Sequence, residues 1–150
     1  MLGRRNLIPN NLRLVKKAVD KVGSSIDVKA RMARDDMMTA LIQLSKEQIK
    51  GRRPPGQKAT AGLPPMNRTG NLRRSIRGEK FQQGFANYSA IVGPTISYGR
   101  SVELGGEYAP RSWHGTSAMK GFPYMAPAFR QFQQHVATQI TMRYFRKGII

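Results

Sequence analysis

The chain has 150 residues, with 26 Lys and Arg against 8 Asp and Glu, no cysteine and two histidines, so its formal net charge is +18. This length fits a single domain over residues 1–150. The absence of cysteine excludes disulfides and cysteine-ligated zinc, and two histidines in separate segments argue against a histidine metal site. Because so much like charge opposes compactness, we expect an acidic or polyanionic partner, either nucleic acid or an acidic protein ring.

Two helical segments are predicted at the N-terminus, after a basic, flexible arm at residues 1–9. Asn10 or Asn11 can cap a first helix, whose apolar residues recur three and four positions apart. These residues are Leu12, Val15, Val19 and Val22. The sequence Gly23-Ser24-Ser25 is a candidate break, and Asp27 is a plausible N-cap of a second helix that ends near Lys50-Gly51.

The pair Asp35-Asp36 lies in the second predicted helix, with Arg31 and Arg34 at ion-pair spacing. Paired acids can act as a general acid and base or bind a metal. Adjacent residues of a helix, however, point about 100° apart and cannot share one substrate. We therefore interpret this pair as part of an exposed charged face rather than as a catalytic site.

A basic region begins where the second predicted helix ends. Residues 51–67 contain four prolines and three glycines, which predicts a loop of polyproline character. Either this loop is simply solvated and mobile, or it becomes ordered on assembly against a neighbouring subunit or DNA. From Lys50 to Lys80 there are nine Lys or Arg and one acid, Glu79. The candidate DNA or inter-subunit contacts are Arg52, Arg53, Arg68, Arg73, Arg74 and Arg77.

A β-hairpin is predicted next. Thr69 or Asn71 can cap a single helical turn, which leads into a strand over residues 76–82, a turn at Gln83-Gly84 and a return strand over residues 88–92. Two strands alone are marginal in water, so we expect a small antiparallel sheet of three or four strands.

A short helix over residues 98–104 follows, and Gly105-Gly106 ends it. The segment 105–121 has little periodicity and reads as a second loop that orders on assembly. Its Trp113 packs within the chain, anchors an interface or stacks on a base, and the sequence leaves these three roles open. The candidate interface anchors are Tyr98, Tyr108, Trp113, Phe122 and Tyr124.

The last predicted element is a C-terminal helix with Pro127 in its first turn. Its apolar face is formed by Phe129, Phe132, Val136, Ile140 and Tyr144. We expect this face to cover the sheet. The fold class is therefore α+β, with N-terminal helical segments, a small antiparallel sheet and a C-terminal helix packed on the sheet.

Four short motifs occur in a fixed order between residues 66 and 129. They are RTGNLRRSI at 68–76, VGP at 92–94, YGRSVELGG at 98–106 and FPYMAPAF at 122–129. In this order they resemble the tail-completion or head-to-tail joining proteins of long-tailed, lambdoid-type phages. One departure is Gly99, where that family usually has alanine.

The resemblance implies a structural virion protein: a tail-completion or neck subunit in a hexameric ring at the head-proximal end of a phage tail. Viral genomic DNA would pass through the lumen, and the neighbours would be other neck proteins and tail-tube or tail-terminator proteins. The protein would be located in the virion, and in the bacterial host cytoplasm during assembly.

The residues themselves favour no enzyme. There is no P-loop, no G-x-S-x-G and no His/Asp/Glu cluster with metal spacing, so we expect no catalytic residue, cofactor or metal. No apolar run approaches the ~18 residues that span a bilayer, and no signal peptide is expected at the N-terminus. The alternative function is that of a non-enzymatic, sequence-independent nucleic-acid-binding protein, although the basic residues are dispersed and no known nucleic-acid-binding motif is recognised.

Overall fold

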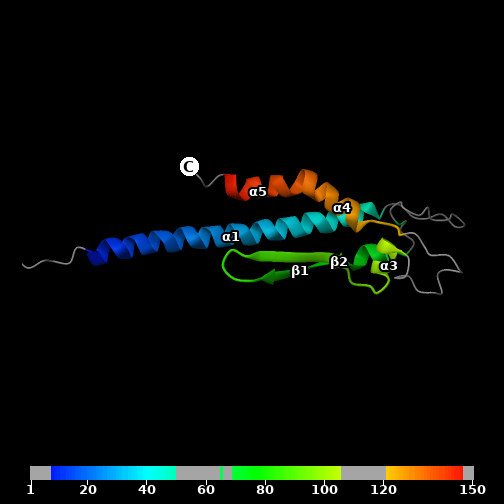
Figure 1. Cartoon of the computed structure of the whole chain (residues 1–150), viewed down its shortest axis with the longest axis horizontal. Coiled ribbons are helices and arrows are strands. Elements are labelled where there is room, and N and C mark those ends of the chain that lie inside the picture. Colours follow the sequence, from blue (N-terminus) through cyan, green and yellow to red (C-terminus); the bar gives the residue numbers. More distant parts are fainter. Residues whose placement is uncertain (1–7, 50–64, 66–68, 106–120, 147–150) are drawn as a thin grey trace, which may run out of the picture.

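A computed structural model describes residues 8–49, 65, 69–105 and 121–146. Its central element is the long helix α1, Ile8–Gln48. A β-hairpin lies along one side of α1 and the C-terminal helices lie along the other, while the first half of α1 extends beyond both (Figure 1). This arrangement of helices with an antiparallel hairpin confirms the predicted α+β class.

The helix α1 is continuous, so the prediction of two separate N-terminal helices is wrong. It begins at Ile8, inside the predicted arm, and it passes through Gly23 and Ser24 without a break. The hydroxyl of Ser24 donates to the Lys21 carbonyl oxygen at 2.9 Å. Asp27 does not cap a helix. Its carboxylate instead accepts hydrogen bonds from the Ala86 N–H and the Tyr88 hydroxyl, at 2.9 and 2.7 Å.

The hairpin consists of β1, Ile76–Gln82, and β2, Tyr88–Pro94. Among the described residues it is a two-stranded sheet, rather than the three or four strands that we expected. The apolar cover that a further strand would supply comes from α1. Gly78 permits this close approach, because a Cβ atom there would lie 2.5 Å from the Met38 sulfur.

Two short helices flank the hairpin. Helix α2, Asn71–Ser75, is the predicted single turn before β1. Helix α3, Gly99–Leu104, follows β2 and ends at Gly105, whose φ of 66° is unfavourable for other residues. The glycine at position 99 also has a steric reason: a Cβ atom there would lie 2.5 Å from the Pro94 ring.

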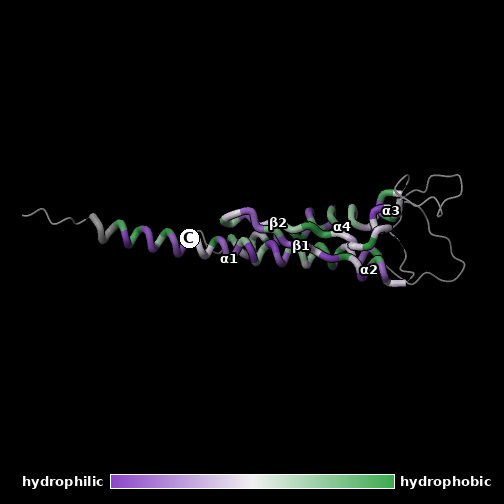
Figure 2. The backbone as a smooth tube through the Cα atoms, turned by 90° about the horizontal axis from the view of Figure 1, so that it is seen from below, coloured by the Kyte–Doolittle hydropathy of each residue, from purple (hydrophilic) through white to green (hydrophobic). Residues whose placement is uncertain are grey.

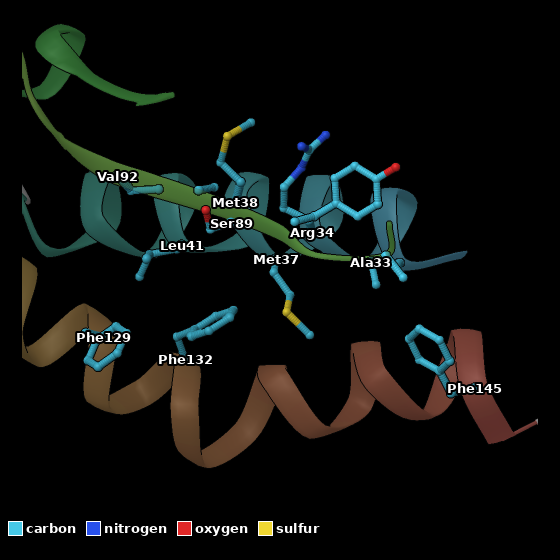
Figure 3. A pocket seen from close by; sticks show the side chains of 14 residues that line it. Ala33, Arg34, Met37, Met38, Leu41, Ser89, Val92, Phe129, Phe132 and Phe145 are labelled. Atoms are coloured by element: carbon cyan, nitrogen blue, oxygen red, sulfur yellow. The ribbon is translucent and has the colours of Figure 1, made fainter. Parts of the chain in front are cut away.

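The C-terminal helix has three parts: α4, Met125–Gln131, the π-helical turn η3, Phe132–Val136, and α5, Ala137–Phe145. It packs chiefly against α1. It also faces β2 across an apolar groove of about 370 Å³. Figure 3 shows Phe129, Phe132 and Phe145 on one side of this groove and Met37 and Leu41 on α1 at its base.

Candidate assembly site

The four sequence motifs meet at one end of the molecule, where α1 ends. The buried side chains there are those of Ile49, Ile76 and Tyr124. The first motif supplies Leu72 and Ile76, the second Val92, the third Val102, and the fourth Tyr124 and Met125. We call this cluster, with Glu103, the motif junction. Residues from all four motifs, as many as 53 positions apart from Leu72 to Met125, thus lie in one small core.

Glu103 links the third motif to the fourth. Its Oε2 accepts hydrogen bonds from the N–H groups of Tyr124 and Met125, at 2.7 and 3.0 Å. Its Oε1 accepts one from Ala126 at 2.9 Å. The first N–H groups of a helix have no partner within the helix, and a negative charge is favourable near them. Glu103 therefore caps α4 from a different helix.

Tyr124 is fully buried, so it has no exposed surface to offer a neighbouring subunit. Its predicted role as an interface anchor is therefore corrected to that of a core residue. Its hydroxyl faces the Gly99 carbonyl oxygen at 3.4 Å. Burial, together with the nearby Glu103 carboxylate, raises the pKa of Tyr124 well above its usual range.

The remaining anchor candidates are divided between the described and undescribed residues. Tyr98 and Phe122 are half-buried beside the junction, and the Phe122 N–H donates to the Val102 carbonyl oxygen at 2.7 Å. Gly121 allows this contact, since a Cβ atom there would overlap the Glu103 carbonyl oxygen. Tyr108 and Trp113 lie outside the described residues, as does most of the predicted loop 105–121.

The adjacent acids on α1 hold different parts of the fold. Asp35 pairs with Arg34 and with Lys80 of the hairpin, at 2.7 and 3.0 Å. Burial acts to raise the pKa of the Asp35 carboxyl, but its bonds with Lys80 and Arg34 outweigh that effect and lower it. Asp36 instead faces the C-terminal helix. The two carboxylates thus diverge, as the helical geometry requires.

Asp36 accepts a hydrogen bond from the Tyr144 hydroxyl at 2.7 Å and pairs with Arg143 at 3.3 Å. The bond to Asp36 raises the pKa of Tyr144. Asp27 and Asp35 of α1 bond to the hairpin, and Glu103 of α3 bonds to α4. Together with Asp36, four of the eight acids therefore hold elements of this chain together. They leave little acidic charge to compensate the exposed basic residues.

The described basic candidates are Arg73, Arg74 and Arg77, all exposed, on α2 and β1 beside the junction. The Arg74 guanidinium donates to the Thr69 carbonyl oxygen at 3.1 Å and to Asn71 Oδ1 at 2.8 Å, so it also fixes the turn before α2. No ion pair involves Arg73 or Arg77 within the described part of the chain. Arg52, Arg53 and Arg68 lie outside the described residues, as does most of the predicted loop 51–67.

The groove beside α1 is lined mainly by apolar side chains. Its charged lining residue, Arg34, forms an ion pair with Asp35, and its guanidinium lies 5.0 Å from the centre of the Tyr88 ring. Across residues 8–49, 65, 69–105 and 121–146, no group of three or more acidic, histidine or cysteine side chains could hold a metal ion. Within the same ranges, no helix has both the length and the apolar character needed to cross a membrane.

Comparisons with protein-family models, curated proteins and solved structures found no match to this chain.

Proposed function

We propose that this protein is a structural virion protein, a tail-completion or head-to-tail joining subunit of a long-tailed phage. Several copies form a ring, hexameric by the family resemblance, at the head-proximal end of the tail, with genomic DNA passing through the lumen. The subunit acts by assembly and carries out no reaction. The observation that carries the proposal is the motif junction, in which all four motifs of the resemblance contribute to one core.

The junction supports the proposal because the motif residues depend on one another. Glu103 bonds the backbone of the fourth motif, Gly99 accommodates Pro94 of the second, and Ile76 of the first packs in the same core as Tyr124. A fold shared with that family would require such contacts between the motifs.

The charge distribution supports a polyanionic neighbour. Arg73 and Arg77 are exposed beside the junction and form no ion pair within the described residues, while Asp35 and Glu103 are bonded to other groups. A lumen that carries DNA would compensate such residues through phosphate contacts that do not depend on sequence. An acidic neighbouring ring would compensate them as well.

The test is complementation of joining in vitro. Removing the gene from the phage that encodes this chain should leave filled heads and free tails, and adding the purified protein should restore joined, infectious particles. The Arg73→Gln/Arg77→Gln variant should restore fewer of them. Arg130→Gln/Arg146→Gln, which removes the same charge from exposed positions on the C-terminal helix, is the matched control. Heads and tails that join normally without this chain would refute the proposal.

The net charge of +18 favours a second candidate, a non-enzymatic protein that binds nucleic acid without sequence preference. The two candidates differ in what forms without DNA. A particle of ring mass in the absence of DNA supports the joining subunit. A protein that forms no ring, yet binds duplex DNA with an affinity that falls steeply as salt rises, supports the alternative.

A further inference from the structure

The first half of α1 carries an apolar stripe that nothing in the described chain covers. This half extends beyond the hairpin and the C-terminal helix, and hydrophobic residues recur along it (Figures 1 and 2). The exposed fractions of the stripe residues are Leu12 67%, Val15 58%, Val19 63%, Val22 59% and Ile26 42%. At the tip of the hairpin, Phe85 is 67% exposed and lies against Gly23, which lengthens the apolar surface.

The stripe has the spacing of a coiled-coil seam. Its residues alternate strictly three and four positions apart, an average period of 3.5, whereas a surface helix that packs on a globular core shows a broader apolar face. Beyond Ile26 the same line continues into Ala30, Ala33 and Met37, and Ala33 is only 4% exposed. The stripe is therefore the outward continuation of the seam that already packs against the rest of the chain.

The residues beside the stripe allow two copies to meet despite their net charge. The positions that flank a seam are Lys16 and Gly23 on one side and Ala18 and Ser25 on the other, so a single charge lies there. The other basic residues of this half, Arg13, Lys17 and Lys21, occupy positions that point away from the seam.

We propose that the stripe is covered by the same stripe of a second copy of this chain, in an antiparallel helix pair. Val15 packs against the partner's Ile26, and Val19 against the partner's Val22. Lys16 then lies beside the partner's Gly23 rather than beside another lysine. The antiparallel direction also places the two basic bodies at opposite ends of the pair, which reduces their repulsion.

The pair is a weak dimer that forms independently of the proposed ring. In this register the paired stripe residues run from Val15 to Ile26, so the seam is about 17 Å long and buries somewhat less than about 1,000 Å² in total, the size of a weak interface. A ring of cyclic symmetry joins unlike surfaces, whereas this pair joins like surfaces. The dimer is therefore a property of the free protein, and the failure of either proposal leaves the other standing.

Sedimentation velocity of the full chain without DNA or other virion proteins tests the dimer. The dimer fraction should rise with protein concentration and also with salt, because salt screens repulsion between the two +18 chains. Val19→Asp should weaken dimerisation by at least about tenfold, because it buries an unpaired charge in the seam. Leu14→Asp is the matched control: Leu14 is 64% exposed and points away from the stripe on the same helix, so its replacement should leave the dimer intact.

Disulfide trapping tests the direction of the pair. The chain has no native cysteine, so each variant carries a single thiol. An antiparallel seam predicts that Val19→Cys and Val22→Cys cross-link when mixed, and that each cross-links poorly alone. Circular dichroism and the melting temperature establish that each variant is folded. A wild-type chain that stays monomeric at all concentrations, equal effects of Val19→Asp and Leu14→Asp, or efficient cross-linking of Val19→Cys with itself would overturn the proposal.

Discussion

The two ends of α1 carry similar apolar patterns but meet different surroundings. Around Ala33, Ser45 and Ile49 the helix is buried by the hairpin, the C-terminal helix and the motif junction. At the other end, Val15, Val19 and Val22 of the stripe are more than half exposed. Helical periodicity therefore tells which face of α1 is apolar, and only the neighbouring elements decide whether that face contributes to the stability of the single chain.

The largest expected difference between the two ends comes from truncating one large side chain at each. Tyr124→Ala at the junction should lower the free energy of unfolding by about 3–5 kcal/mol, since it leaves a cavity in a small core. Val22→Ala in the free half should change it by less than about 0.5 kcal/mol. Urea unfolding of dilute protein gives both values.

If Tyr124→Ala fails to fold, Tyr124→Phe gives a second reading. It removes only the hydroxyl near Gly99 and should cost about 0.5–1.5 kcal/mol. Equal losses for Tyr124→Ala and Val22→Ala would mean that the junction is not the core of the fold.

Removing the side chain that caps α4 should have a smaller effect on the free energy of unfolding. Glu103→Ala leaves three backbone N–H groups without their acceptor and should cost about 2–3 kcal/mol. Glu47→Ala is the control, because Glu47 is an exposed acid near the end of α1 and should cost less than about 0.5 kcal/mol. Thermal unfolding measures both, and a Glu103→Ala protein as stable as the wild type would contradict the assigned cap.

The smallest expected effect is that of acid on Asp27, which lies at the boundary between the covered and free parts of α1. The bond from the Tyr88 hydroxyl and that from the Ala86 N–H lower the pKa of Asp27 below its ordinary value of 3.8. A carboxyl whose pKa is lower in the folded than in the unfolded state stabilises the fold at pH values above its unfolded-state pKa. That stabilisation disappears as the pH falls through the folded-state pKa. The hairpin tip should therefore loosen from α1 below about pH 3.8.

The NMR signal of the Ala86 amide should report this transition. Asp27→Asn should abolish its acid transition, and Asp20→Asn, a change at an exposed acid two turns earlier on the same helix, should leave it unchanged. An Ala86 signal that moves identically in the wild type and in Asp27→Asn would show that another group controls the tip.

Local sequence signals predict where helices and strands lie better than they predict which residues contact one another. The sequence predicts the strand over residues 76–82 and the helix over 98–104, and the structure has Ile76–Gln82 and Gly99–Leu104. The predicted break at Gly23 fails because one glycine costs a helix only about 1 kcal/mol, which the adjoining turns absorb. Asp27 reads as a cap locally, yet its partners lie 59 and 61 residues away.

The junction could be predicted only in part. The four motifs mark its residues, but the capping of α4 by Glu103 joins groups 21 to 23 residues apart in the sequence, and no spacing rule connects them. The burial of Tyr124 was missed for a similar reason: an aromatic residue between two prolines reads as a surface anchor until the elements around it are known. The N-cap position of α4 is Tyr124, whose side chain makes no capping hydrogen bond. A predicted helix without a capping residue of its own is therefore the signal that points to a distant acid.

The π-helical turn Phe132–Val136 bears on how relatives of this chain will differ in length. Such a turn holds one residue more than an α-helical turn, as an insertion into a regular helix would produce. Loss of Gln133 or Gln134, both exposed, would restore regular winding at this turn and leave the helix after it on the same face. Ile140 and Tyr144 would therefore still face α1. In a relative that has regular winding here, a gap of one residue in the alignment should be accompanied by an unchanged apolar pattern after it.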